Sequence, residues 1–252
     1  TDEKPTHIAL CFDGSVTSCF RNDMYPAYKS NRPSPPSELM AQIGRCREFA
    51  EALGIACFDV KAYEADDLIG TIGTSLSSDG HKCVVVTNDK DLCQLVGPMI
   101  SVYDFAKGKR YDEAGVVHRM GVKPSQVVDL LGLMGDAVDC IPGVKGIGSK
   151  TASCLLKSFA NLESLYANLD AVESLPIRGA TGIRKKLASQ KEMAFLSRKL
   201  ATLVCKVPLR TGGLRGLQRR RLAKGPLTAL HRLLDRFGLA RLHDRVDAMF
   251  GA

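Results

Sequence analysis

Short, mostly apolar runs separated by amphipathic segments organise the first 105 residues of this sequence. The runs occupy residues 7–12, 56–60, 82–87 and 100–105. Apolar residues at helical spacing lie between them, over 37–53 and 65–76. Strands that are buried on both faces have continuous runs of Val, Ile and Cys, whereas strands with one solvent-exposed face alternate apolar and polar residues. The pattern therefore predicts an α/β fold with a mostly parallel twisted sheet flanked by helices.

Acidic residues follow the first three of these runs. Asp13 ends the first run, Glu64, Asp66 and Asp67 crowd together after the second, and Asp89 comes after the third. Because the carboxyl ends of parallel strands form the ligand-binding edge of a sheet, we expect these acids to meet there. Like charges a few ångströms apart raise one another's pKa, so such a cluster normally needs a cation. The sequence therefore predicts a divalent-metal site lined by carboxylates.

After residue 105 the pattern predicts helices alone. Apolar residues recur at helical spacing over 112–120, 124–134, 149–159, 162–165, 185–203, 227–237 and 239–249. Two aspartates, Asp136 and Asp139, follow the second of these helices. This region is therefore expected to be all-helical.

A glycine-rich turn from Gly143 to Gly148 follows the two aspartates. It lacks the preceding strand of a P-loop and the lysine directly after the second glycine, which disfavours an ATP site. Glycine backbone and the N–H groups that begin a helix can instead hold a phosphodiester without reading bases. The alternative is an ordinary glycine-capped joint between helices, but the aspartates favour nucleic acid. The predicted DNA contacts are Gly143, Lys145, Gly146, Gly148, Ser149, Lys150 and Thr151.

The net charge of +8 is concentrated at the C-terminal end. Residues 206–252 hold 11 Lys and Arg against 3 acids, whereas residues 1–205 hold 24 of each. A basic tail beside an acid-rich site indicates a polyanionic partner together with cations. The alternative is a solvated arginine-rich face, which composition alone leaves open.

The nine cysteines are scattered and include no CxxC pair, so neither a zinc knuckle nor a disulfide framework is indicated. This usage fits a reducing intracellular compartment, and the bacterial cytoplasm and an organelle such as the mitochondrion are both compatible with it. No apolar run approaches the ~18 residues of a membrane span, and the N-terminus does not read as a signal peptide. We therefore expect a soluble monomer without a membrane partner.

Several short motifs occur in a fixed order along the chain. They are Phe20-Arg21, Tyr28-Lys29-Ser30 with Arg32-Pro33, Glu64-Ala65-Asp66-Asp67, Thr87-x-Asp89-Lys90-Asp91, Gly135-Asp136-x-x-Asp139, Ile141-Pro142-Gly143 through Ala152, and Leu200-Ala201-Thr202. Together they resemble the 5′-nuclease domain of bacterial DNA polymerase I and its relatives, the phage and organellar flap endonucleases. The similarity covers the chain to about Pro208, and the final helices more weakly.

The resemblance implies a structure-specific 5′ nuclease, acting as a 5′ flap endonuclease and 5′-3′ exonuclease on branched or nicked DNA or on RNA primers in RNA/DNA hybrids. It implies a two-metal mechanism with two Mg²⁺ ions, for which Mn²⁺ would substitute. By matching position, the ligands of the first metal are Asp13, Glu64, Asp66 and Asp67. The residues that hold or orient the second metal are Asp89, Asp91, Asp136 and Asp139.

The resemblance also assigns roles to basic and aromatic residues. Lys29 and Arg32 match the family's cations over the scissile phosphate, Tyr28 matches a neighbouring aromatic residue that would stack on an unpaired base, and Arg21 matches a further basic position. Residues 143–152 match a helix-hairpin-helix type (helix-3-turn-helix) module that grips duplex DNA, where family members often bind K⁺.

Three regions follow from these matches. Residues 1–108 form the α/β metal-dependent nuclease core, with an arch at about 31–47 through which a single strand passes. Residues 109–205 form the helical region, with the duplex-binding hairpin at 135–158. Residues 206–252 form a basic helical tail that packs back on the core.

One departure from the family concerns the first motif. The family begins with a strand ending in Asp-Gly-Ser and a helix, and only then reaches the Phe-Asp segment. Here Phe20-Arg21 follows Phe12-Asp13 at the spacing of the second motif, so we expect the first strand and its aspartate to be absent from this chain. The alternative function is therefore a non-catalytic or activity-impaired structure-specific nucleic-acid-binding protein on the same fold. At least seven matching acids favour the nuclease, because a degenerate site would relieve their repulsion.

Overall fold

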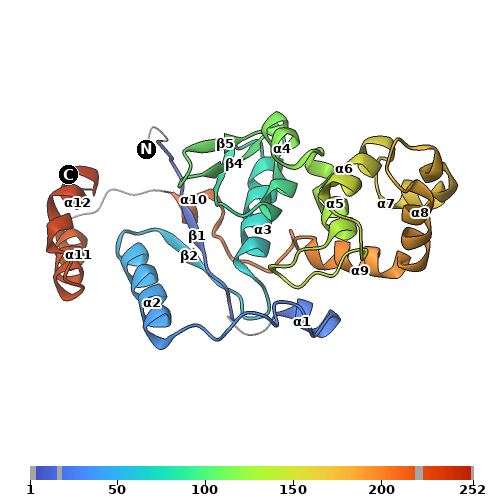
Figure 1. Cartoon of the computed structure of the whole chain (residues 1–252). Coiled ribbons are helices and arrows are strands. Elements are labelled where there is room, and N and C mark those ends of the chain that lie inside the picture. The colour runs from blue at the N-terminus through green and yellow to red at the C-terminus, as the bar shows by residue number, and fades with distance from the viewer. Residues whose placement is uncertain (1–3, 16–18, 219–223, 251–252) are drawn as a thin grey trace. The chain divides into compact units, whose positions relative to one another are not determined.

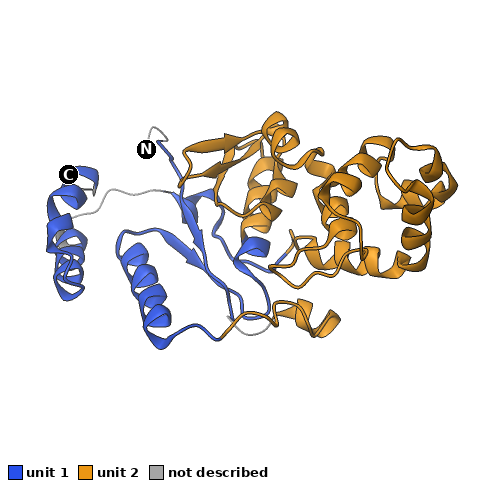
Figure 2. Cartoon of the chain, viewed as in Figure 1, with its two compact units in different colours: residues 1–17, 34–68, 207–252 blue, residues 18–33, 69–206 orange. Residues whose placement is uncertain are grey.

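A computed structural model describes residues 4–15, 19–218 and 224–250 of the chain (Figure 1). The chain divides into two compact units (Figure 2). Unit 1 comprises residues 1–17, 34–68 and 207–252, and unit 2 comprises residues 18–33 and 69–206. The division falls within helix α3 (Ala65–Ser78), which begins in unit 1 and continues in unit 2.

Unit 1 contains a two-stranded parallel sheet of β1 (Ala9–Cys11) and β2 (Ala56–Phe58), with Leu10 opposite Cys57. The long helix α2 (Ser37–Ala52) precedes β2 and contains most of the residues of the predicted arch segment. The remaining elements of this unit are α10 (Gly213–Leu217), α11 (Lys224–Arg236), η4 (Ala240–Leu242) and α12 (His243–Phe250). These elements contain the basic tail of the sequence, of which residues 219–223 and 251–252 lie outside the described residues.

A small apolar core holds the tail in unit 1. Leu230 and Leu234 of α11 are fully buried. They form one apolar cluster with Leu53, which follows α2, and with Val246 of α12. An ion pair between Arg236 and Glu48 joins α11 to α2 beside this core. Within unit 1 the tail therefore packs against the helix that matches the arch.

Unit 2 contains a three-stranded sheet. The strands β3 (Cys83–Val86) and β4 (Ile100–Asp104) are parallel, and β5 (Lys109–Tyr111) is antiparallel to β4. Its helices are α1 (Phe20–Met24), η1 (Asp91–Leu95), α4 (Glu113–Met120), η2 (Pro124–Gln126), α5 (Val127–Met134), α6 (Ser149–Ser158), α7 (Leu162–Ala167), η3 (Leu169–Ser174), α8 (Ala180–Ser189) and α9 (Lys191–Ala201). One continuous apolar core runs from the sheet through these helices.

The helices α5 and α9 pack closely along one another and form the centre of the helical region (Figure 1). Gly132 of α5 permits the close approach, because a Cβ there would lie 2.9 Å from the Cβ of Arg198 and 3.0 Å from the carbonyl oxygen of Ala194. The contact fixes the position of the loop that leaves α5 with Asp136 and Asp139.

The structure differs from the sequence-based expectations in several elements. The helix expected over 185–203 is two helices, because Gln190 has a non-helical backbone between α8 and α9. Helix α1 and strand β5 have no counterpart among the elements expected from the sequence. The expected sheet is present as two small sheets among the described strands. None of the helices in the described ranges is long and apolar enough to cross a membrane.

Gly132→Ala is expected to destabilise the protein by about 1–3 kcal/mol, because the added methyl group overpacks the contact between α5 and α9. The measurement is the free energy of unfolding from urea denaturation. Gly182→Ala in α8 is the matched control, since a Cβ there has no atom within 4 Å and should stabilise by about 0.4–1 kcal/mol. Equal effects of the two substitutions would contradict the packing explanation.

Candidate metal centre and nucleic-acid interface

Unit 1 brings Asp13 to the start of helix α3. The Ala65 N–H donates a hydrogen bond to Asp13 Oδ1 at 2.8 Å, so Asp13 lies beside the predicted ligands Glu64 and Asp66. Gly14 permits this arrangement, because a Cβ at that position would lie 2.0 Å from the carbonyl oxygen of Val60. The structure therefore brings together the first two of the acidic segments that the sequence predicts to meet.

The acids of α3 lie in its first turn, where the helix dipole stabilises negative charge. Asp67 is fully buried, and its Oδ2 accepts a hydrogen bond from the Glu64 N–H at 3.3 Å. Burial, and then the negative charges of Asp66 and Cys57, raise the pKa of Cys11 to about 12. Asp66 thus faces the end of β1, whereas Asp67 closes the turn that presents its neighbours.

Unit 2 brings together four other acids from two loops. Asp89 and Asp91 follow β3, and Asp136 and Asp139 follow α5. Asp89 Oδ1 accepts a hydrogen bond from the Asp91 N–H at 2.8 Å. Burial, and then the charge of Asp89 reinforced by Asp136 and Asp139, raises the pKa of Asp91 to about 7, although Lys90 opposes the shift. These four residues therefore form one group of carboxylates whose charges interact. Their spacing in the sequence alone could not show this.

Basic side chains form ion pairs with these carboxylates. Lys90 Nζ lies 2.5 Å from Asp136 Oδ2, and Arg32 Nη2 lies 2.6 Å from Asp139 Oδ1. Lys29 Nζ lies 3.5 Å from Asp139 Oδ2. Burial opposes the charge of Lys90, but the hydrogen bond to Asp136 and the neighbouring carboxylates outweigh it and raise the pKa of Lys90. Lys90 was not among the site residues predicted from the sequence. Its position between two acids could have indicated that it pairs with a carboxylate.

A strained backbone positions Lys29. Lys29 and Cys140 are the two non-glycine residues with a left-handed backbone in the described part of the chain, with φ of 54° and 55°. The Lys29 N–H donates to the Asp139 carbonyl at 3.0 Å, and Asn31 Nδ2 donates to the Ala137 carbonyl at 3.2 Å. Such strain is common at functional sites, where surrounding contacts hold it in place.

Tyr28 is predicted to stack on an unpaired base, but only 4% of its surface is exposed. Its hydroxyl donates to Asp139 Oδ2 at 3.4 Å. A buried ring cannot offer a face to a nucleotide, so this geometry favours a role in orienting Asp139. Burial depends on the surrounding helices, which explains why the motif alone did not reveal it.

Arg21 matches a further basic position of the family, but only 2% of its surface is exposed. Its Nε donates to the Leu200 carbonyl at 2.8 Å, and its Nη2 donates to the Thr202 carbonyl at 3.0 Å. These bonds hold α1 on the end of α9, so the geometry favours a structural role for Arg21.

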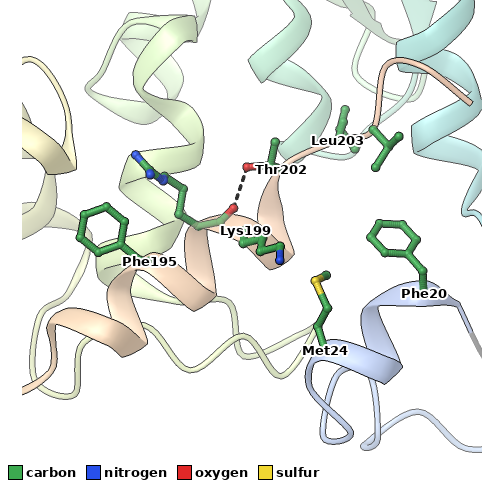
Figure 3. Close-up of a pocket in the computed structure, with 8 residues that line it drawn as sticks. Phe20, Met24, Phe195, Lys199, Thr202 and Leu203 are labelled. Atoms are coloured by element: carbon green, nitrogen blue, oxygen red, sulfur yellow. Dashed lines mark hydrogen bonds between the residues drawn. The ribbon is translucent and has the colours of Figure 1, made fainter.

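A cavity of about 500 Å³ lies beside this attachment (Figure 3). Phe20 and Met24 of α1 lie on one side of it, and Phe195 and Lys199 of α9 lie on the other. None of the predicted metal ligands lines this mainly apolar cavity.

The predicted DNA-binding hairpin connects α5 to α6. Asp136 and Ile141 exchange two backbone hydrogen bonds of 2.8 Å at its base. Gly143 has φ of 62° and a Cβ there would lie 2.3 Å from the Gly135 nitrogen, so the position requires glycine. Its N–H donates to Ser197 Oγ at 2.9 Å in the interior. This geometry therefore favours a structural role for Gly143 over a phosphate contact.

The other predicted residues of the hairpin lie at the surface. Thr151 is half-buried, and the exposed residues are Lys145, Gly146, Gly148, Ser149 and Lys150. No side chain caps the N-terminus of α6 among the described residues. The arrangement leaves an exposed turn with two lysines at the start of a helix, as a phosphate-binding surface requires.

The carboxylates of unit 2 offer oxygen donors to a divalent cation. Among the residues that the structure describes, no group of three or more Asp, Glu, His or Cys side chains is arranged to hold a metal ion. However, Asp91 Oδ1 is buried without a hydrogen-bond partner, and burial, followed by the charge of Asp89, raises the pKa of this carboxyl. Carboxylate oxygens are the ligands that Mg²⁺ and Mn²⁺ take in proteins. The donor set therefore fits such an ion, and Lys90 and Arg32 bind two of its members in this structure.

The sequence matches two family models in tandem. Residues 1–121 match the 5′-3′ exonuclease, N-terminal resolvase-like domain, and residues 122–223 match the 5′-3′ exonuclease, C-terminal SAM fold. DNA polymerase I of Pseudomonas aeruginosa is 44% identical over 203 residues, covering 80% of this chain and 22% of that protein. A 5′-3′ exonuclease of Buchnera aphidicola is 38% identical over 202 residues, covering 80% and 70%. The chain therefore belongs to the 5′-3′ exonuclease family.

A solved structure of the same fold is the T5 flap endonuclease in a pseudo-enzyme-product complex with DNA and metal ions. It has a TM-score of 0.64 and 20% sequence identity, and the match covers 95% of this chain and 85% of that one. The likeness confirms the predicted α/β fold followed by a helical region. The chain spans about a fifth of the length of the DNA polymerase I relatives, with 22% and 20% covered.

Asp91→Asn is expected to stabilise the metal-free protein at pH 8 by about 1–3 kcal/mol, and much less at pH 5. The pKa of Asp91 is raised in the folded state. Its stabilising contribution is therefore fully present below pH 3.8 and is lost as the pH rises through about 7. The measurement is the free energy of unfolding in EDTA at both pH values. Asp79→Asn, at an exposed turn, is the control, and a difference from wild type that is the same at both pH values would contradict the assignment.

Proposed function

We propose that this chain is a divalent-metal-dependent 5′ nuclease that hydrolyses phosphodiesters of branched or nicked DNA, with 5′ flaps as the characteristic substrate. The observation that carries the proposal is the group of four acids in unit 2, where Asp91 is buried with a raised pKa and with an Oδ1 that has no hydrogen-bond partner. Basic side chains stand at the same group, as expected where an anionic phosphate must approach several acids. Membership of the 5′-3′ exonuclease family supports this reading.

Two carboxylate groups would hold the cations, each within its own unit. In unit 1 the ligands would be Asp13, Glu64 and Asp66, with Asp67 closing their turn. In unit 2 they would be Asp89, Asp91, Asp136 and Asp139. We propose two Mg²⁺ ions with Mn²⁺ as a substitute, because both metals take oxygen ligands. Bound divalent cations would supply an activated water and neutralise charge on the transferring phosphoryl group.

The side chains of unit 2 have separate tasks in this proposal. Lys29 and Arg32 bind the scissile phosphate, because both place positive charge at Asp139 and are at least partly exposed. Tyr28 holds the Asp139 carboxylate through its hydroxyl. Lys90 balances Asp136 when no cation is bound. The phosphate and the carboxylates thus compete for the same positive groups, which makes binding of substrate and cation interdependent.

The hairpin would hold the duplex part of the substrate. Lys145, Lys150 and the exposed backbone from Gly146 to Thr151 can contact phosphates without reading bases, which suits recognition of DNA structure. Its main-chain carbonyls are the proposed site for K⁺. RNA/DNA hybrids are a second proposed substrate, and we propose a monomer in a reducing compartment such as the bacterial cytoplasm or an organelle.

A non-catalytic nucleic-acid-binding protein is the second candidate function. The ion pairs of Lys90 and Arg32 with Asp136 and Asp139 favour it, because they satisfy these acids without a metal. Cleavage measurements separate the two functions.

The wild-type chain is expected to cleave a fluorescently labelled 5′-flap duplex near the junction in Mg²⁺ or Mn²⁺ and to be inactive in EDTA. Asp136→Asn is expected to lower the rate roughly 100- to 1,000-fold, because it weakens stabilisation of the charge that develops during the reaction. The measurement is the initial cleavage rate on denaturing gels, with Asp79→Asn as the control. Tight binding of the flap substrate without cleavage would support the non-catalytic function instead.

A further inference from the structure

Helix α8 carries three consecutive cations, Arg184, Lys185 and Lys186. Arg184 is neutralised by Asp170 at 3.1 Å and Glu173 at 2.6 Å. The preceding and following apolar residues of the helix, Ile183 and Leu187, are buried. Lys185 and Lys186 are both exposed, so they differ mainly in which part of the surface their side chains reach.

The side chain of Lys186 lies across the glycine turn of the hairpin. A Cβ added at Gly146 would lie 2.6 Å from Lys186 Nζ, 3.2 Å from Cε and 3.5 Å from Cδ. The aliphatic stem therefore runs over the Gly146 backbone, and its ammonium group lies at the turn. Gly146 also has φ of 85°, which a side chain rarely adopts. The absence of a side chain at Gly146 thus makes room for Lys186.

The end of α8 is fastened to the same turn. The Lys145 N–H donates to Gln190 Oε1 at 2.8 Å, and Gln190 Nε2 donates to the Lys186 carbonyl at 3.4 Å. These bonds hold the last turn of α8 against the hairpin. Lys186 is therefore placed before any ligand arrives, which lowers the entropic cost of binding through it.

Two acid-free stretches of the sequence meet at this contact. Residues 140–162 contain Lys145, Lys150 and Lys157 without an Asp or Glu, and residues 174–191 contain five Lys and Arg without an acid. No ion pair of Lys186 is found in the part of the chain that the structure describes, unlike its neighbour Arg184. Two adjoining stretches that carry Lys and Arg but no Asp or Glu are typical of a polyanion-binding site.

We propose that Lys186 is a phosphate-binding residue and that the last turn of α8 and the hairpin form one composite site for the backbone of duplex DNA. In this site Lys186 and Lys145 bind phosphates on the two sides of Gly146. The inference rests on the proposed function, because it extends the surface that holds the duplex. It assigns a DNA contact to a helix outside the glycine-rich motif.

The test is equilibrium binding of a fluorescent 5′-flap duplex in EDTA, followed by anisotropy between 50 and 200 mM NaCl. Each phosphate that a protein neutralises adds about 0.9 to the slope of log K against log salt. Lys186→Ala is therefore expected to reduce the magnitude of that slope by about 0.9 and to weaken binding by a similar factor for duplexes of different sequence. Lys186→Arg should retain the wild-type slope.

Lys185→Ala is the matched control, since it removes the same charge from the same helix without removing the contact at Gly146. Its slope is expected to equal that of the wild type. Equal reductions for Lys185→Ala and Lys186→Ala, or an unchanged slope for Lys186→Ala, would overturn the proposal. The midpoint of thermal unfolding checks that each exposed-site variant remains folded.

The same titration separates this inference from the proposed nuclease function. A wild-type chain that binds the duplex but does not cleave it in Mg²⁺ refutes catalysis, while the slope still decides the role of Lys186. A chain that cleaves flaps and shows no slope change in Lys186→Ala refutes only the composite site. A wild-type chain that does not bind duplex DNA at all refutes the composite site together with the grip proposed for the hairpin.

Discussion

Electrostatic repulsion among the acids of unit 2 is the constraint on which its surrounding structure depends. Asp89, Asp91, Asp136 and Asp139 share one region, and burial makes their charges more costly than they would be in water. The fold offsets part of this repulsion with Lys90 and Arg32. Asp91 nevertheless keeps a raised pKa and an unpartnered buried oxygen. A fold that maintains such unfavourable crowding is suited to binding a cation.

The helical region supports this group through close packing. Gly132 lets α5 approach α9, and Ser197 of α9 accepts the N–H of Gly143, so α9 fixes both ends of the loop that contains Asp136 and Asp139. Arg21 attaches the end of α9 to α1, which precedes the Lys29 turn. The cations and the acids that they meet are thus held by a common scaffold within unit 2.

Sequence patterns predicted the local environment of one acid correctly and missed that of other residues. Asp13 was expected to lie near the acidic turn because both follow apolar strands, and its hydrogen bond with Ala65 bears this out. The meeting of this group with Asp89 stays a prediction. Gly143 was expected to contact phosphate, but a motif cannot show that Ser197, 54 residues away, uses its N–H. The burial of Tyr28 could likewise not be read from its motif, because it depends on distant helices.

The sequence by itself determined which residues can carry charge, where most of the strands and helices run, and which turns contain glycine, because these properties depend on side chains and spacings within a few residues. Only the tertiary structure decided which charges are paired and which groups are buried. Arg21 and Leu200 are 179 residues apart, and Arg32 and Asp139 are 107 apart. Contacts at such separations arise from packing of whole helices, as does the passage of Lys186 over Gly146. Local periodicity contains no information about that packing, so these roles could not be read from the sequence.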